Sequence, residues 1–311
     1  MLVIAMSVTV FWGFAVAPSA YAVEMCDDMT ATIVGTSGDD SLTGTGGNDV
    51  IVGLGGNDTI IGLAGNDLIC AGEGDDTVVA GLGNDAIRGE AGIDLLIGDE
   101  RNPAPGTQST SYATGDDNIS GGTGDDTAFG DFEEATIPVP LLIPLFSLIP
   151  GRDTINGDED DDTIYGDGET VTAPVHVGIL RAGNTINGGQ GDDHIVGNFH
   201  DVSALIYVVD ATSQGDIIDS GDGNDTVHGD SVSISTLGPT FLSSGMRDTI
   251  SAGNGNDTVF GDYENGAAAP NPAVGAGFTD TLDGGADTDT ADGGPPDDDT
   301  CTNFETQTNC P

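Results

Sequence analysis

A nine-residue unit rich in glycine and aspartate repeats along most of this chain. It runs without interruption through residues 44–52, 53–61 and 62–70, and weaker copies precede and follow this block. Nineteen copies place an aliphatic residue or alanine two positions after an aspartate, which Asn184 replaces in one copy. Self-similarity at a short fixed period predicts a repeat architecture in which each unit packs on its neighbours.

The composition limits the possible partners of this chain. It carries 53 acidic residues against five arginines and no lysine, for a formal net charge of -48. A basic patch for nucleic acid or anionic membranes is therefore excluded, and multivalent cations are the natural counter-charge. Acidity alone would also fit a disordered chain, but the register between aspartate and aliphatic residues favours a chain that folds once its charge is neutralised.

The N-terminus predicts export. Residues 2–16 are apolar, and Ala20-Tyr21-Ala22 has the small-x-small pattern of a signal-peptidase site, which predicts a signal peptide over 1–22 and a secreted, extracellular mature chain from Val23. The absence of Lys and Arg from the first residues is unusual, and a membrane anchor is the alternative. Because the apolar run is shorter than the ~20 residues that a span needs, we expect no membrane span in the mature chain.

The spacing of the repeats divides the mature chain. We predict an N-terminal segment over 23–34, a regular nonapeptide block over 35–97, a region of longer repeats over 98–300 and a cysteine-containing tail over 301–311. Export permits disulfides, and we hypothesise the pairs Cys301 with Cys310 and Cys26 with Cys70. A metal-thiolate cluster is not expected because the chain contains no CxxC.

The units follow the pattern G-G-x-G-x-D-x-U-x, where U is aliphatic. They resemble the calcium-binding nonapeptide of the RTX (hemolysin-type) family over roughly residues 35–301. The resemblance implies an all-β fold, a parallel β-roll or β-solenoid in which six residues turn and bind Ca²⁺ and three form a short strand. Two units then complete one coil.

The residue types independently fit calcium. Glycines at the first, second and fourth positions permit positive φ and close approach of the backbone, which directs carbonyl oxygens inward, and aspartate adds an anionic oxygen. Ligand sets made only of oxygen suit Ca²⁺. The alternative is a metal-free solenoid held by backbone ladders, but such a solenoid has no need for aspartate at every ninth position.

Side chains alternate along a strand, so only the U position of each unit is expected to face the interior. One aliphatic residue per nine cannot offset the conformational entropy of so many glycines, and we expect several bound Ca²⁺ ions to supply much of the folding free energy. The predicted interior positions are Leu42, Ile51, Ile60, Ile69, Val78, Ile87, Leu96, Ile119, Ala128, Ile155, Ile164, Ile186, Ile195, Ile218, Val227, Ile250, Val259, Leu282 and Ala291.

Consecutive units alternate between the two edges of a roll, which assigns the predicted metal ligands to edges. The first edge carries Asp40, Asp58, Asp76, Asp94, Asp126, Asp162, Asp193, Asp225, Asp257 and Asp289. On the opposite edge the turns with intact glycines carry Asp49, Asp67 and Asp85. Later positions on that edge are Asp117, Asp153, Asn184, Asp216, Asp248, Asp280 and Asp298, where we expect weak or absent sites.

The insertions that lengthen the repeat all fall in passing from the first edge to the second. The return step is always nine residues, so the coil grows to about 32 residues with a loop on one edge only. Residues 171–180, 202–209 and 231–237 are β-prone, and 137–150 are apolar and interrupted by prolines. These loops could stack beside one another and extend the sheet. They either pack on their own roll or offer a contact surface to a cell-surface or protein partner.

Catalytic motifs are absent from the sequence. The four histidines form no H-E-x-x-H, no G-x-S-x-G occurs, and His194 and His228 are predicted to face solvent. We therefore predict a noncatalytic calcium-binding β-roll with a structural or cell-surface role rather than an enzyme, with a secreted hydrolase as a minor alternative. A module that binds carbohydrate or ice is the other alternative, through an outward ladder of Thr127, Thr163, Thr185, Thr226, Thr249 and Thr258.

Overall fold

The computed structural model describes residues 24–100, 111–136, 146–179, 183–206, 215–230, 233–236, 247–261, 279–294 and 299–310. Strands and turns make up this part of the chain, and it contains no helix long and apolar enough to cross a membrane. The predicted signal peptide lies outside the described residues.

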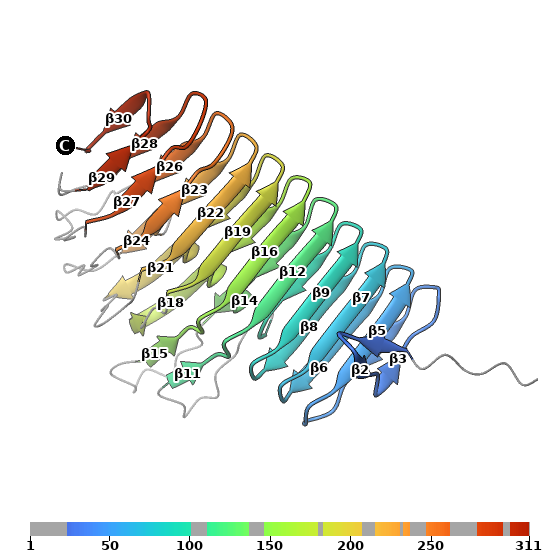
Figure 1. The fold of residues 1–311 in the computed structure, drawn as a ribbon. Helices are drawn as coiled ribbons and strands as arrows, with labels where there is room; N and C mark the ends of the chain where they lie inside the picture. Colours follow the sequence, from blue (N-terminus) through green and yellow to red (C-terminus); the bar gives the residue numbers. More distant parts are fainter. Residues whose placement is uncertain are drawn as a thin grey trace, which may run out of the picture.

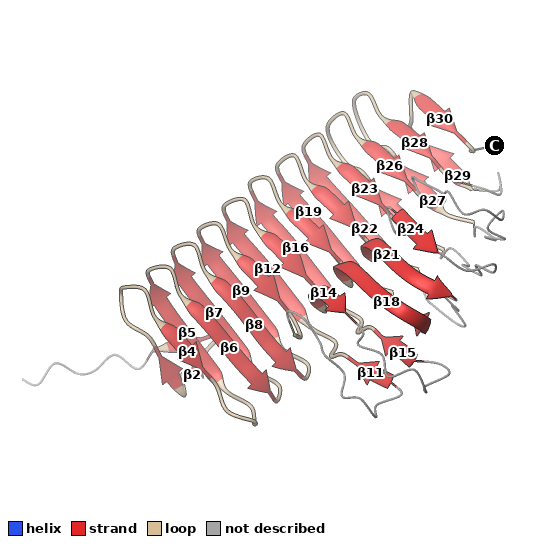
Figure 2. Ribbon diagram, turned by 180° about the vertical axis from the view of Figure 1, so that it is seen from behind, coloured by secondary structure: helices blue, strands red, loops and turns tan. Residues whose placement is uncertain are grey.

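The chain winds into a parallel β-roll, which confirms the predicted fold class (Figure 1). Two eleven-stranded sheets, here called sheet I and sheet II, take up alternate strands of the sequence, so each coil contributes one strand to each. Within sheets I and II every paired strand is parallel to its neighbours. Figure 2 shows the regular progression of the coils from behind.

Sheet I contains, in spatial order, β30 (Thr306–Thr308), β28 (Thr290–Asp292), β26 (Thr258–Phe260), β23 (Thr226–His228), β20 (His194–Val196), β17 (Thr163–Tyr165), β13 (Thr127–Phe129), β10 (Leu95–Ile97), β8 (Thr77–Leu82), β6 (Thr59–Ala64) and β4 (Ser41–Thr43). Sheet II contains β29 (Thr300–Thr302), β27 (Thr281–Asp283), β25 (Thr249–Ser251), β22 (Ile217–Asp222), β19 (Thr185–Gln190), β16 (Thr154–Glu159), β12 (Asn118–Thr123), β9 (Ala86–Ala91), β7 (Leu68–Glu73), β5 (Val50–Gly55) and β3 (Ile33–Val34).

The interior of the roll is the predicted aliphatic ladder. All nineteen predicted interior residues belong to or pack against one core cluster, in which Leu42 is partly buried and the others are buried. Strand registers align them, as in the pairing of Ile60 with Val78 and of Ile155 with Ile186. Most strands contribute one side chain to this core, to which Ala71, Ala80 and Ala252 are added, so the hydrophobic layer is continuous but narrow.

The turns use their glycines in two ways. Positive φ occurs at the second and fourth positions of a unit, as at Leu54 (84°) and Gly56 (97°), and the second position tolerates residues other than glycine. At Gly53, the first position of its unit, φ is ordinary but no space is free, because an added Cβ would overlap the carbonyl oxygen of Ala71 and Oδ2 of Asp58. Close approach rather than positive φ therefore explains the glycine at this turn, whereas Ala71, Ala80 and Ala252 hold the same position in other units.

The insertions stack into a third parallel sheet, sheet III. It contains β11 (Ser111–Ala113), β15 (Phe146–Ile149), β18 (Gly168–Ile179), β21 (Phe199–Ile206) and β24 (Ser233–Thr236), and β14 (Phe132–Thr136) also pairs with β18.

Sheet III confirms that the inserted loops stack on one another, although most of residues 137–150 lie outside the described part. The rings of Phe132 and Phe199 stack with centroids 5.7 Å apart. The ring of His200, on β21, lies 6.1 Å from that of Tyr165 on sheet I. Where the insertions are described, they therefore contact their own roll.

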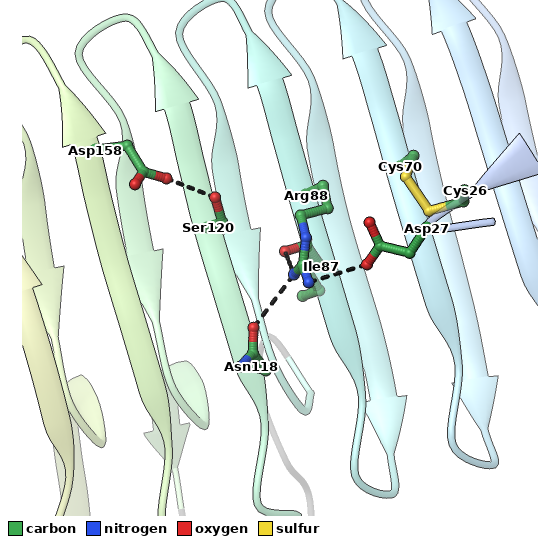
Figure 3. A network of polar contacts seen from close by, with 8 residues as sticks. All are labelled: Cys26, Asp27, Cys70, Ile87, Arg88, Asn118, Ser120 and Asp158. Carbon is green, nitrogen blue, oxygen red and sulfur yellow. Dashed lines mark hydrogen bonds and ion pairs between the residues drawn. A yellow bond between two sulfur atoms is a disulfide. The ribbon is translucent and has the colours of Figure 1, made fainter. Parts of the chain in front are cut away.

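Two disulfides fasten the ends of the roll, and both confirm the hypothesised pairs. Cys26–Cys70 joins the short antiparallel hairpin of β1 (Met25–Cys26) and β2 (Met29–Thr30) to β7, and Cys301–Cys310 closes the last coil. Beside the first disulfide, the carboxylate of Asp27 forms an ion pair with the guanidinium of Arg88 (3.0 Å). The same guanidinium also donates a hydrogen bond to Oδ1 of Asn118 (Figure 3). The hairpin is thus held covalently and electrostatically against sheet II.

Removing the first disulfide should cost more stability than removing the second. Cys26–Cys70 spans 44 residues and Cys301–Cys310 only nine, and the restriction of the unfolded chain increases with loop length. With Ca²⁺ present, we expect the double Cys→Ser variant at 26 and 70 to lose about 2–4 kcal/mol, and the variant at 301 and 310 to lose less. Equal denaturant midpoints for the two variants would contradict this order.

Candidate metal sites

The repeat aspartates form a hydrogen-bonded ladder along each edge. From Asp58 onward, Oδ1 of each accepts the backbone N–H of the equivalent residue one coil earlier, as in Asp58 N to Asp76 Oδ1 (2.7 Å), Asp94 N to Asp126 Oδ1 (2.8 Å) and Asp257 N to Asp289 Oδ1 (3.0 Å). Asp40 and Asp49 begin the two ladders by donating their own N–H groups to Asp58 and Asp67. All thirteen predicted ligands occupy this ladder position; Asp40 is half-buried and the rest are buried. One oxygen of each carboxylate is therefore used in the hydrogen bonds that join successive coils.

The second oxygen has no hydrogen-bond donor in most turns. This holds for Oδ2 of Asp58, Asp67, Asp76, Asp85, Asp94, Asp126, Asp162, Asp193, Asp225, Asp257 and Asp289. A buried carboxylate oxygen left without a partner costs several kcal/mol unless a proton or cation meets it.

A second acceptor lies beside this oxygen. In the unit that begins at Gly121, Asp126 Oδ2 and the carbonyl oxygen of Gly157, one coil further on, both crowd the Cα of Gly121. Gly62 and Gly188 have the same neighbours in their own units, a ladder carboxylate and a carbonyl of the next coil. Two oxygen acceptors therefore lie close to the same point beside each of these glycines, and such a convergence of oxygens suits a hard divalent cation.

The first two turns differ from the others. Asp40 Oδ2 accepts the backbone N–H of Thr36 (2.6 Å) and its hydroxyl (2.8 Å), and Asp49 Oδ2 accepts the same two groups of Thr45 (2.6 and 2.9 Å). These bonds lower the pKa of Asp49, the backbone bond from Thr45 being the largest cause. Threonine at the second position of a unit is the sequence signal for this cap, which the sequence analysis did not use.

At the C-terminal end, one predicted position is shifted by one residue. The backbone N–H of Asp280 donates to Asp299 Oδ1 (2.8 Å), so Asp299, rather than Asp298, occupies the ladder. The tail after the repeats has an irregular spacing, and counting in nines misplaced the position. On the other edge, Glu305 Oε2 accepts the N–H of Asp289 (2.8 Å) and ends the ladder.

A further group of buried polar residues on the loop-bearing edge escaped the sequence analysis. Each directly follows the glycine after a strand of sheet I and is fully buried: Asp99, Asp131, Asp167, Asn198 and Asp230. A Gly-Asp or Gly-Asn pair that ends five residues after each first-edge aspartate from Asp94 to Asp257 was the available signal. Among the described residues no group of three or more His, Cys, Asp or Glu side chains forms a metal cluster, so backbone carbonyls are needed to complete any site.

The side-chain predictions outside the turns need correction. His228 is 3% exposed rather than facing solvent, because it stacks on Phe260 with ring centroids 4.7 Å apart. Burial, followed by the charges of His194 and His200, lowers its pKa to about 3. His194 is half-buried.

The six threonines do not form one exposed ladder. Four of them lie on sheet I and are half-buried: Thr127, Thr163, Thr226 and Thr258. His194 interrupts this row, because it pairs with Thr163 on one side and with Thr226 on the other. Thr185 and Thr249 are exposed but lie on sheet II, on either side of Ile217. A flat threonine face of the kind predicted for ice or carbohydrate binding is not present at these positions.

The family model of the RTX calcium-binding nonapeptide repeat matches residues 34–69, 61–96, 113–132, 150–170, 182–201, 208–231 and 244–263, more than half of the chain. This chain belongs to the RTX calcium-binding repeat family. No curated protein matches it significantly. The matched segments contain the turns in which an aspartate oxygen and a carbonyl of the next coil face each other, so family and geometry agree on calcium.

A methyl group at Gly53 should damage the turn that Asp58 closes. We expect Gly53→Ala to destabilise the Ca²⁺-bound protein by about 1–3 kcal/mol, because the Cβ would overlap Asp58 Oδ2 and the carbonyl of Ala71. Gly46→Ala is the matched control, since nothing lies within 4 Å of its added Cβ and its φ is not positive. Thermal unfolding with Ca²⁺ measures both, and equal losses would contradict the crowding argument.

Without metal, stability should fall as pH rises toward neutrality. Burial raises the pKa of Asp126 to about 6, of Asp94 to about 7 and of Asp162 to about 8. A raised pKa means that the folded chain binds more protons than the unfolded one, so this stabilisation is complete below the unfolded value near 4 and disappears as pH rises to about 8.

The β signal in far-UV circular dichroism of the Ca²⁺-free chain at pH 5, 6, 7 and 8 tests this prediction. Exposed carboxylates are already ionised above about pH 6, so a decrease of the β signal between pH 6 and 8 reports the buried ladder. A β signal that rises from pH 6 to 8, or a folded signal that stays constant, would contradict the raised pKa values.

Proposed function

We propose that this chain is an exported, noncatalytic RTX protein that Ca²⁺ assembles into a rigid β-roll with a structural or cell-surface role. The observation that carries the proposal is the column of buried aspartate oxygens without donors, several of them beside a carbonyl of the next coil. Calcium at these positions would replace repulsion between acceptors by coordination that joins successive coils.

The repeats need metal for energetic reasons as well. The core receives one or two small or aliphatic side chains from each nonapeptide, whereas the chain contains 50 glycines, and a glycine loses more conformational freedom on folding than other residues. Any ion that binds only the folded chain shifts the folding equilibrium in proportion to its own binding. Folding and Ca²⁺ binding should therefore occur as one transition.

Three features support export. Two disulfides are typical of oxidising compartments, the apolar segment with Ala20-Tyr21-Ala22 resembles a signal peptide, and extracellular Ca²⁺ would make folding follow secretion. A predominantly acidic surface favours solubility and repels other acidic polymers. The inserted strands of sheet III, which stack beside the roll, are the segments that we assign to contacts with a cell-surface or protein partner.

A far-UV circular dichroism titration of the metal-free chain tests this proposal. We expect Ca²⁺ to convert a coil spectrum cooperatively into a β spectrum at pH 7.5, and Mg²⁺ at the same concentration to have little effect, because Mg²⁺ prefers rigid octahedral sites and gives up water reluctantly. A β spectrum that chelator leaves unchanged would contradict metal-driven folding and indicate a self-sufficient solenoid.

A further inference from the structure

The five buried residues that follow glycine on the loop-bearing edge form a column of their own. The backbone N–H of Asp99 donates to the carbonyl of Asp131 (2.9 Å), that of Asp131 to Asp167 (3.1 Å) and that of Asp167 to Asn198 (3.1 Å). These bonds stack one residue of the column in each successive coil. The column is separate from the nonapeptide ladder, since its members lie after a strand of sheet I rather than before a strand.

Each member of this column lies beside the ladder residue of the next turn. Asp99 Oδ2 accepts the N–H of Gly115 (2.9 Å), two residues before Asp117, and Asp131 Oδ1 accepts the N–H of Gly151 (3.0 Å), two residues before Asp153. The insertion therefore leaves the roll after one acidic side chain and re-enters it beside another. The result is a pair of buried side chains at each level of the edge.

At two levels one member of the pair is asparagine, and its amide shows what such a pair requires. Asn184 Nδ2 donates to Asp167 Oδ1 (3.0 Å) and to the carbonyl of Gly197 in the next coil (3.0 Å). Asn198 Nδ2 donates to Asp216 Oδ2 (2.9 Å) and to the carbonyl of Gly229 (3.3 Å). In both cases a single –NH₂ group joins a carboxylate to a carbonyl of the following coil.

At the level of Asp99 and Asp117 the same acceptors meet without a donor. Asp117 Oδ2 and the carbonyl of Gly130 both crowd the Cα of Gly98. Neither Asp117 Oδ2 nor Asp99 Oδ1 has a hydrogen-bond partner, and both side chains are buried.

The next level repeats the arrangement. Asp153 Oδ2 and the carbonyl of Gly166 crowd the Cα of Gly130, and Asp153 Oδ2 and Asp131 Oδ2 lack partners. Asp131 and Asp153 are both 0% exposed. Two buried carboxylates and a carbonyl that converge in this way need a positive charge between them.

We propose that the loop-bearing edge binds Ca²⁺ at the Asp99/Asp117 and Asp131/Asp153 pairs, and that the amides of Asn184 and Asn198 take the place of the ion at the next two levels. The proposal rests on the calcium-driven folding proposed above. It differs from the expectation that this edge beyond Asp85 has weak or absent sites, which considered only the lost turn glycines and not the Gly-Asp pairs that replace them.

Native mass spectrometry of the folded chain in Ca²⁺ tests the proposal by counting ions. Asp117→Asn should recreate the arrangement of Asn184, lose one bound Ca²⁺ and keep the β spectrum. Asn184→Asp should create an additional pair of aspartates, opposite Asp167, and gain one bound Ca²⁺. Asn184→Asp is the decisive variant if Asp117→Asn fails to fold.

The control variant is Asp126→Asn on the uninterrupted edge. From the proposed function we expect this variant to lose at least one bound Ca²⁺ ion. A wild-type chain without bound Ca²⁺, or an Asp126→Asn variant with unchanged stoichiometry, would contradict the proposed function. If Asp126→Asn loses ions while Asn184→Asp gains none, only the sites of the loop-bearing edge are overturned.

Discussion

The roll depends on the repeat aspartates, whose two carboxylate oxygens have different roles. In most repeat aspartates, one oxygen accepts a backbone N–H from the preceding coil and so sets the register, whereas the other is buried with nothing to donate to it, in several turns beside a carbonyl of the next coil. The first interaction can form in any folded chain, but the second is unfavourable without a proton or a cation. Stability and metal binding therefore involve the two oxygens of a single side chain.

Much of this architecture could be predicted from the sequence because its period is short and exact positions recur. The interior ladder, the one-sided insertions and both disulfides followed from spacing and residue type, and the parallel roll followed from the resemblance to the RTX nonapeptide. What failed were features that depend on contacts between distant coils. His228 is buried because it stacks against Phe260 of the next coil, on the outer face of sheet I, and the six threonines divide between two sheets because alternate units do.

The candidate sites were predicted only for turns that keep the family pattern. The capping role of Thr36 and Thr45 depends on side-chain direction within a turn, and the column from Asp99 to Asp230 depends on where each insertion re-enters the roll. Neither follows from a nonapeptide pattern. The recurrent Gly-Asp pair was visible in the sequence, but its meaning required the three-dimensional pairing with Asp117 and Asp153.

The two edges of the roll differ in how much length variation they tolerate. Along the loop-bearing edge the bond from one ladder residue to the next spans 18 residues at Asp67 to Asp85, 32 at Asp85 to Asp117, 36 at Asp117 to Asp153 and 31 at Asp153 to Asn184, yet the geometry of the bond is unchanged. Loop closure costs little more when a loop lengthens, so this edge can accept foreign segments without disturbing the coil. The roll is therefore a scaffold in which one edge keeps turns of constant length and the other edge can accept inserted segments.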